Sequence, residues 1–208
     1  LKDLLKLSPE RLQRYWIPLV KPVMFLAKPV SIDPYLLGLL IGDGALRGPS
    51  ITFSTNDKDI LARVSETVQP HYCVKYHSNY DYRISALNPR ASAGSLDKGT
   101  YVHPKGYYHA HLYNKHLGSS ETLEAAREMR DVAEREFYGA DYVPKDKRLA
   151  PNLRQLGLYG LYSHERFIPD GYKYNTQQVR LEVLRGIMDA DGFVNKHGQA
   201  CLEQTSKR

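Results

Sequence analysis

Apolar residues spaced three and four positions apart predict most helices of this chain. One of them is opened by Asp33-Pro34, because aspartate caps a helix and proline fits its first turn. The predicted helices cover residues 35–41, 119–138, 153–161 and 176–190, with another behind Asn56 or Asp57 and a short leucine-rich one within 1–12. In the longest helix the charged positions are expected to face solvent and the apolar ones inward. These inward positions are Leu123, Ala126, Met129, Val132, Ala133 and Phe137.

Alternation of apolar and polar residues predicts the strands. It is clear in residues 80–84, where tyrosine and isoleucine alternate with aspartate and arginine, and it also covers 51–54, 74–77 and 107–112. Prolines at 18, 22 and 29 favour an extended segment before the helix predicted at 35–41. The chain is therefore expected to combine helices with β-strands.

The chain contains an internal repeat. Residues 36–44 (LLGLLIGDG) and 184–192 (LRGIMDADG) share the first leucine, the third-position glycine, a small residue at the seventh position and a final Asp-Gly. A strand and a polar turn are expected after each copy, at 52–58 and 202–207. Two copies of one unit predict a pseudo-twofold arrangement in which the two repeated helices pack together.

Small residues recur on one face of each repeated helix. These residues are Gly38 and Gly42 in the first copy, and Gly186 and Ala190 in the second. Such faces let two helix backbones approach closely, which would place the two carboxyl-terminal ends side by side.

Each repeated helix ends in an aspartate, Asp43 or Asp191. A lone Asp-Gly step is usually only a helix stop, but two copies of the whole pattern favour a shared site. Two carboxylates, with the nearby carbonyls of Gly42 and Ala190, form a hard oxygen site suited to Mg²⁺, which can activate water and stabilise the leaving oxygen of a phosphodiester. Asp189 is the weaker candidate because Ile41 stands at its repeat position.

Charge is segregated along the chain, whose 29 basic and 23 acidic residues give +6 at pH 7. The segment 71–118 is basic and holds eight of the sixteen tyrosines and six of the eight histidines. Basic and aromatic residues alternating on strands suit contact with a DNA groove, although about half of these tyrosines are expected to pack under the sheet. The expected DNA contacts are Lys75, Tyr76, Tyr82, Arg83, Lys105, His109 and Lys115. Zinc binding by His103, His109, His111 and His116 is the weaker alternative, since matching cysteine or acidic spacing is absent.

Composition excludes several classes of protein. The 208 residues are 42% hydrophobic and 25% charged, which is a globular balance and not that of a disordered chain. The two cysteines, Cys73 and Cys201, form neither a disulfide framework nor a CxxC zinc site. With no apolar run long enough for a membrane span and no signal sequence at residues 1–12, we expect a cytoplasmic, reduced protein.

The two repeated segments resemble the paired motifs of the LAGLIDADG homing endonucleases, particularly those inserted in inteins. The lead-in Ile32–Tyr35 and the block formed by Leu156–Gly160 and Ser163–Pro169 are also similar to that family. The resemblance covers about residues 17–208. It implies an α+β fold of two αββαββα halves, whose curved sheets lie in the major groove over a long asymmetric DNA site.

The resemblance also implies an activity and its residues. Asp43 and Asp191 would hold Mg²⁺ and cut both strands of double-stranded DNA, in a monomer that pairs its two halves internally. Arg166 occupies the position where the family commonly has a catalytic lysine. Arginine keeps the charge and can stabilise a pentavalent phosphate, but it stays protonated and is a poor base. A surface arginine without a catalytic role is the alternative.

The expected organisation has three parts. Residues 1–31 are a lead-in at the border with an intein splicing domain, 32–170 form the first αββαββα half, and 171–208 start a second half. The family pattern needs more strands in the second half than residues 193–208 provide, and the splicing residues of an intein are missing from the sequence. Two alternatives to an endonuclease therefore stay open, namely a nucleic-acid-binding module without cleavage and an inactive intein remnant.

Overall fold

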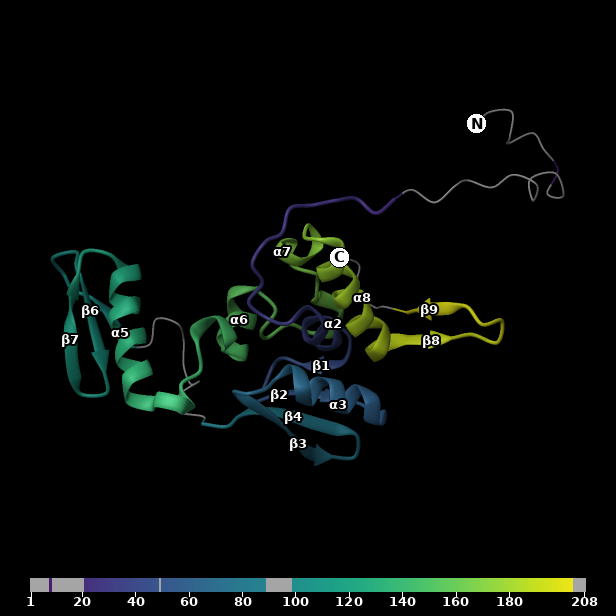
Figure 1. The fold of residues 1–208 in the computed structure, drawn as a ribbon, viewed down its shortest axis with the longest axis horizontal. Coiled ribbons are helices and arrows are strands. Elements are labelled where there is room, and N and C mark those ends of the chain that lie inside the picture. The colour runs from purple at the N-terminus through teal and green to yellow at the C-terminus, as the bar shows by residue number, and fades with distance from the viewer. Residues whose placement is uncertain (1–7, 9–20, 49, 89–98, 204–208) are drawn as a thin grey trace.

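The two repeated segments form helices that lie against each other at the centre of the computed structural model, which describes residues 8, 21–48, 50–88 and 99–203 (Figure 1). Helix α2 spans Pro34–Asp43, and the Asp33 side chain caps it by accepting a hydrogen bond from Leu36 N. Helix α8 spans Gln177–Asp191 and is capped by Thr176. Both helices end immediately before the glycine of the Asp-Gly step, as the repeat predicts.

A four-stranded antiparallel sheet follows the first repeated helix. Its strands are β1 (Gly44–Ala45), β2 (Ile51–Ser54), β3 (Tyr72–Ser78) and β4 (Asp81–Ala86), in the order β1-β2-β4-β3. Helix α3 (Lys58–Thr67) connects β2 to β3 and is capped by Asp57. One face of the sheet, through Phe53 and Ile84, joins the hydrophobic core with α2 and α3. The other face is free to carry polar side chains.

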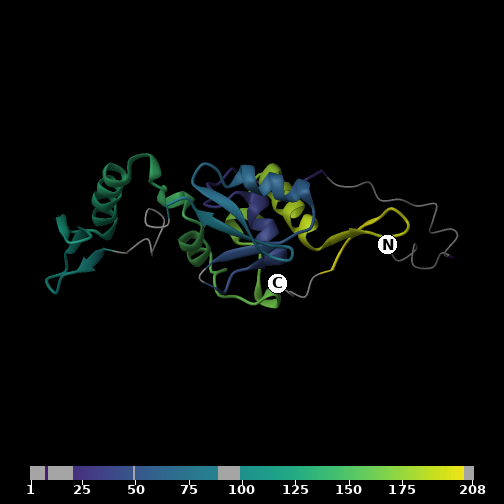
Figure 2. The ribbon, with the colours of Figure 1, turned by 90° about the horizontal axis from the view of Figure 1, so that it is seen from below.

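A separate lobe interrupts this arrangement. Strands β5 (Thr100–Val102), β6 (Tyr108–Leu112) and β7 (Lys115–Ser120) form a three-stranded antiparallel sheet, and helix α5 (Leu123–Tyr138) packs on it around the buried Ala110. The basic segment 71–118 is thus divided between two sheets. The lobe and the β8–β9 hairpin extend from opposite ends of the central body in both ribbon views (Figures 1 and 2).

Helix α5 is oriented differently from the sequence expectation. Of the expected inward positions, Met129, Val132 and Phe137 are exposed, whereas the charged residues Arg130 and Glu134 are buried. The reason is a pair of ion pairs: the Glu134 carboxylate contacts the guanidinium of Arg130 at 2.5 Å and also that of Arg148. The charged face of α5 therefore joins the lobe to the segment that leads into the next helix.

The remaining elements complete the central body. Helix α6 covers Leu149–Gln155, α7 covers Asp170–Lys173, and three 3₁₀ turns lie at Gly139–Asp141, Lys145–Lys147 and Ser163–Glu165. The helix expected at 153–161 ends early, because Gly157 and Gly160 adopt φ of 72° and 90°. Strands β8 (Gly192–Val194) and β9 (Ala200–Leu202) pair as a hairpin after α8.

The second half begins as the first half does. Gly44 pairs with Phe53 behind α2, and Gly192 pairs with Leu202 behind α8. The mixed α+β architecture with antiparallel sheets agrees with the sequence analysis. The expected short helix within 1–12 and the polar turn at 204–207 lie outside the described residues, apart from Ser8. No helix in the described part of the chain combines the length and apolarity needed to cross a membrane.

Candidate functional site

The repeated helices contact each other through reciprocal glycines. A Cβ atom placed on Gly38 would lie 2.1 Å from the carbonyl oxygen of Val183, and one placed on Gly186 would lie 2.1 Å from the carbonyl oxygen of Tyr35. Because real Cβ atoms do not approach backbone oxygens so closely, only glycine fits at both positions. The contacts pair equivalent positions of the two copies, so the helices run in parallel and present the same end.

The carboxyl-terminal ends of α2 and α8 therefore meet. A Cβ atom on Gly42 would lie 2.5 Å from the Cβ of Ala190 and 3.2 Å from Oδ2 of Asp191. Asp43 follows Gly42 directly and is exposed, while Asp191 is half-buried. The structure thus brings together the two aspartates and the four small residues that the repeat singles out.

The electrostatic environment shows that the two carboxylates act on each other. Loss of hydration raises the pKa of Asp43 above its ordinary value of 3.8, and the nearby Asp191 raises it further. Arg166 and a hydrogen bond from Ser54 act in the opposite direction but leave the pKa raised. Two carboxylates that repel each other at the end of paired helices form a site that favours a bound cation.

Arg166 lies close to this pair and contacts the backbone at the end of α2. Its Nη1 donates to the carbonyl oxygens of Ile41 at 3.0 Å and Gly42 at 2.9 Å, with a longer bond to Leu40, and its Nη2 donates to that of Gly44. Residue Arg166 is only 7% exposed. The surface-arginine alternative is therefore wrong, and the guanidinium caps the last carbonyls of α2. Burial lowers the pKa of Arg166 below its ordinary value. Asp43 and Asp191 act in the opposite direction but leave the pKa lowered.

The strand beside Asp43 adds a third carboxylate that sequence reasoning missed. Asp81 pairs in register with Ser54, and Ser54 Oγ donates to Asp81 Oδ1 at 2.6 Å. Asp81 also raises the pKa of Asp43, which places it close to the helix ends. Ser54 and Asp81 meet only through the register of β2 and β4. The one sign of this contact in the sequence is that each strand has a polar residue at that end.

The expected DNA contacts on the central sheet divide between its two faces. Lys75 lies directly opposite Arg83, which lies opposite Thr52, so these three share the face that carries Ser54 and Asp81. Tyr82 lies on the other face, where its ring stacks on Phe53 with centroids 5.8 Å apart, and Tyr76 packs against Tyr82 at 6.0 Å. Tyr82 was expected to contact DNA, but it packs against the hydrophobic core and does not share a face with Lys75 and Arg83. The signal in the sequence is that Tyr82 and Ile84 alternate with Asp81 and Arg83, which places the tyrosine on the apolar face of the strand.

The other expected DNA contacts lie in the separate lobe. Lys105 is in the turn between β5 and β6, His109 is on β6, and Lys115 begins β7. They do not share a sheet with Lys75 and Arg83. The structure therefore offers two distinct groups of basic residues, and only the group on the central sheet adjoins the paired aspartates.

Asp189 has a different role from Asp191. Its Oδ2 accepts a hydrogen bond from the Tyr35 hydroxyl at 2.8 Å, which ties α8 to the first turn of α2. Burial and Asp189 both raise the pKa of Tyr35, and the Arg63 guanidinium lies 3.5 Å from the centre of its ring. This contact is structural, in agreement with the repeat alignment that ranks Asp189 below Asp191.

The donor set at the helix ends fits Mg²⁺ in its chemistry. Asp43 and Asp191 supply carboxylate oxygens, and Ala190, whose carbonyl the sequence analysis also named, directly precedes Asp191 on α8. The carbonyl of Gly42 is already bonded to Arg166, so the two carboxylates carry most of the expected affinity. Among the described residues, no cluster of three or more His, Cys, Asp or Glu side chains is placed closely enough to hold a metal. A cation here would thus complete its coordination with water or phosphate oxygens.

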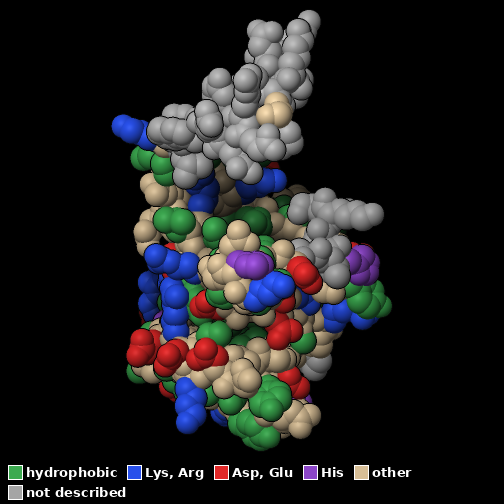
Figure 3. Space-filling view, turned by 90° about the vertical axis from the view of Figure 1, so that its right-hand side faces the viewer, with side chains coloured by type: hydrophobic (Ala, Val, Ile, Leu, Met, Phe, Trp, Pro, Cys, Tyr) green, Lys and Arg blue, Asp and Glu red, His purple; other side chains and the backbone are tan. Residues whose placement is uncertain are grey.

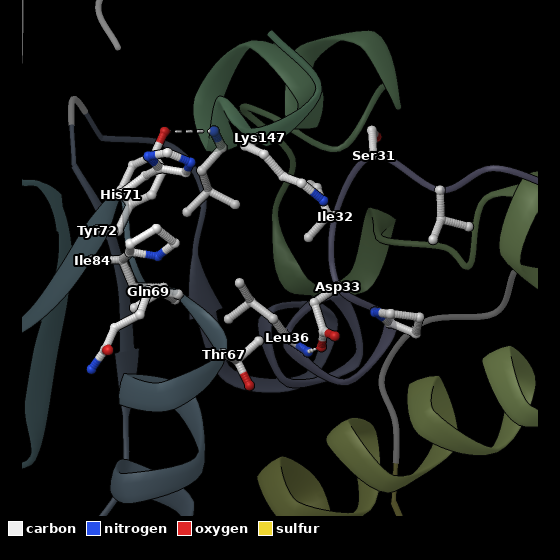
Figure 4. A pocket seen from close by; sticks show the side chains of 15 residues that line it. Ser31, Ile32, Asp33, Leu36, Thr67, Gln69, His71, Tyr72, Ile84 and Lys147 are labelled. Carbon is white, nitrogen blue, oxygen red and sulfur yellow. Dashed lines mark hydrogen bonds between the residues drawn. The ribbon is translucent and has the colours of Figure 1, made fainter. Parts of the chain in front are cut away.

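A cavity of about 360 Å³ lies at the opposite end of α2 and is separate from the aspartate pair. Figure 4 shows side chains from α2, α3 and β3 around it. Two of its polar groups make capping or loop contacts: Asp33 accepts from Leu36 N at 3.0 Å, and the Tyr72 hydroxyl accepts from Leu149 N at 2.9 Å. The cavity is therefore lined by apolar side chains together with the polar groups of Gln69, His71 and Lys147.

The end of the molecule with the β8–β9 hairpin is not uniformly basic. In Figure 3, which faces this end, Lys and Arg side chains gather along one side and Asp and Glu side chains gather below them. Comparison with models of protein families and with curated proteins gives no match for this chain.

Proposed function

We propose that this chain is a site-specific double-strand DNA endonuclease of the LAGLIDADG type, which hydrolyses phosphodiesters with Mg²⁺ over a long asymmetric site. The observation that carries the proposal is the reciprocal packing of Gly38 and Gly186, which sets Asp43 and Asp191 at one shared helix end. One aspartate from each copy of a repeat suits a reaction that must be performed on two strands. The packing of the two motif helices within one chain favours a monomer.

Each group at the helix ends has a defined task in this proposal. Asp43 and Asp191 would hold the cation, which when bound activates water and stabilises the leaving oxygen. Arg166 fixes the carbonyls of α2, so that Asp43 stays at its place beside Asp191. We assign Arg166 to positioning because its guanidinium is buried and engaged with the backbone.

DNA would lie along the polar face of the central sheet. Lys75 and Arg83 are placed to contact phosphates, and Thr52 to contact sugar or base edges. Because Ser54 and Asp81 lie on the same face near Asp43, a duplex on this face would have its backbone close to the paired carboxylates. In the same proposal the chain belongs to an intein, with a splicing domain bordering residues 1–31.

A second candidate is a nucleic-acid-binding module that does not cleave. It is favoured by the β8–β9 hairpin, which pairs with no further strand among the described residues. Among the described residues, the two strands that follow α8 then offer less sheet surface to DNA than the sheet that follows α2. An intein remnant with neither binding nor cleavage is the third reading, and the experiment below separates all three.

The test is cleavage of a randomised double-stranded DNA library by the purified chain in Mg²⁺, with sequencing of the cut ends. We expect enrichment of one long site, and at least about a 100-fold loss of cleavage in Asp43→Asn and in Asp191→Asn, since a lost metal ligand removes several kcal/mol of transition-state stabilisation. Asp189→Asn is the matched control, because Asp189 lies on the same helix but bonds Tyr35.

Each outcome identifies one reading. Cleavage that survives either Asp43→Asn or Asp191→Asn contradicts the endonuclease proposal. Salt-sensitive retention of DNA without cut ends, unchanged by both substitutions, identifies the binding module. Absence of both binding and cleavage identifies the remnant.

A further inference from the structure

The outer face of the lobe sheet carries a cluster of four histidines, which the proposed endonuclease reaction does not use. Ala110 is buried against α5, so its neighbours His109 and His111 on β6 point to the opposite face. His116 on β7 lies directly across from His111, and His103 follows β5. These histidines come from three neighbouring segments and meet on one surface.

Two of the imidazoles are at ligand-to-ligand distance. His109 Nδ1 lies 3.1 Å from His116 Nε2, and Ser119 Oγ lies 2.9 Å from the same His109 nitrogen. Two nitrogens bound tetrahedrally to one zinc ion, each at about 2.0–2.1 Å, are separated by roughly 3.3 Å. The side chains of His109 and His116 therefore already have nearly the spacing that a shared metal imposes.

The geometry points to a transition-metal site formed by His109 and His116, with His111 as the third ligand. The ring centres of His111 and His116 are 4.9 Å apart, and those of His109 and His111 are 6.2 Å apart. Since no three potential ligands are yet gathered in the described chain, His111 has to rotate towards the pair when the metal binds. The His111 side chain is half-buried and its ring packs edge-on against Tyr101 with centroids 5.6 Å apart, so the rotation exchanges that ring contact for a metal bond.

The chemistry of the cluster selects the kind of metal. Imidazole nitrogens suit Zn²⁺, Ni²⁺ and Cu²⁺, whereas Mg²⁺ and Ca²⁺ prefer oxygen ligands. This site and the pair of Asp43 and Asp191 would thus take different metals. A metal bridging β6 and β7 would cross-link the two strands that support α5 and would stabilise the lobe. The inference does not depend on the endonuclease proposal.

The test is calorimetric titration of the chelator-treated full chain with Zn²⁺, at neutral pH and without a polyhistidine tag. Cys73→Ser and Cys201→Ser are introduced first, so that thiols do not contribute. We expect saturation at one Zn²⁺ per chain and no competition from excess Mg²⁺. His109→Gln and His116→Gln are each expected to lower the affinity at least about 100-fold, because loss of even an outer-shell partner costs about 10–100-fold.

Matched variants decide between this site and adventitious binding. His197→Gln and His164→Gln replace histidines outside the lobe and are expected to leave Zn²⁺ affinity unchanged. Far-ultraviolet circular dichroism of every variant shows whether the fold is retained. The inference is overturned if the chain binds no Zn²⁺, or if folded His109→Gln and His116→Gln bind it as tightly as the parent chain does.

Discussion

Gly38 and Gly186 make equivalent contacts with the opposing helix: a Cβ atom added to either glycine would lie 2.1 Å from a carbonyl oxygen of that helix. The two oxygens belong to Val183 and Tyr35, which are themselves equivalent positions of the repeat. The interface is therefore close to twofold symmetric at the level of single atoms. This symmetry places Asp43 and Asp191 at one shared end. If the two copies packed unequally, the two aspartates would be separated.

We expect Gly38→Ala and Gly186→Ala each to destabilise the protein by about 1–3 kcal/mol or more, because the added methyl group meets rigid backbone. The helices can accept it only by moving apart. Urea denaturation measures the change in the free energy of unfolding.

Gly171→Ala is the matched control for these two variants. Gly171 also lies in a helix, but a Cβ atom there would meet nothing within 4 Å. Its free energy of unfolding is expected to change by no more than about 0.5 kcal/mol. Gly38→Ala or Gly186→Ala as stable as this control would contradict the close packing of α2 on α8.

Asp43 gives the protein a stability that depends on pH in an unusual direction for a carboxylate. Its folded pKa is raised above 3.8, mainly by loss of hydration and then by Asp191. The native state therefore takes up a proton at a higher pH than the unfolded state, and stability falls as pH rises through the interval between the two pKa values. We expect Asp43→Asn to be more stable than the parent chain at pH 7 in the absence of divalent ions, with the difference shrinking towards pH 3.8.

Denaturation at a series of pH values checks this expectation, with Asp59→Asn as a control of opposite sign. Asp59 lies in the first turn of α3, where a negative charge is favourable, so its loss is expected to cost about 0.3–1 kcal/mol at pH 7. Added Mg²⁺ is expected to stabilise the parent chain and not Asp43→Asn. An Asp43→Asn variant less stable than the parent chain at pH 7 without divalent ions would contradict the repulsion between Asp43 and Asp191.

Much of this fold could be predicted because its signals are local. The repeated helices carry their own caps, Asp33 and Thr176, and their own stops, Gly44 and Gly192. The small-residue faces likewise follow from spacing along a single helix. The sequence therefore places the paired aspartates without any knowledge of the rest of the fold.

The features that were not predicted depend on contacts between residues far apart in the sequence. Glu134 is buried on α5 because Arg148, which lies beyond the end of that helix, contacts it. Ser54 meets Asp81 only through the register of β2 and β4. Helical periodicity treats every charge as solvent-facing, and strand alternation gives no register, so neither contact could be read from pattern alone.

Arg166 is expected to act through the backbone of α2. Arg166→Met removes the charged donor from the buried carbonyls of Ile41 and Gly42 and is expected to cost about 3 kcal/mol of stability. Arg166→Lys retains the charge but loses the fork of donors, so we expect a smaller loss. Arg154→Met, which removes an exposed guanidinium stacked on Tyr159, is the control. Equal stability of Arg166→Met and Arg154→Met would contradict the capping role.

The ion pairs of Glu134 are expected to hold the lobe to the central body. Glu134→Ala leaves Arg130 and Arg148 buried without their shared carboxylate and is expected to cost about 3–5 kcal/mol. Glu136→Ala removes an exposed carboxylate two residues away and is expected to change stability by less than about 0.5 kcal/mol. Thermal unfolding of both variants compares them, and similar losses would contradict the burial of the charged face of α5.

The proposed DNA surface predicts how binding depends on salt. Lys75→Ala and Arg83→Ala, on the polar face of the central sheet, are each expected to weaken DNA binding and to reduce the slope of log affinity against log salt by about 1, because each removes one phosphate contact. Lys58→Ala is the matched control, since Lys58 is exposed at the start of α3, on the side of the sheet covered by that helix. Fluorescence anisotropy at several salt concentrations measures the slopes. If Lys58→Ala lowers the slope as much as Lys75→Ala does, DNA does not bind the face that carries Ser54 and Asp81, and the paired aspartates lose their expected substrate.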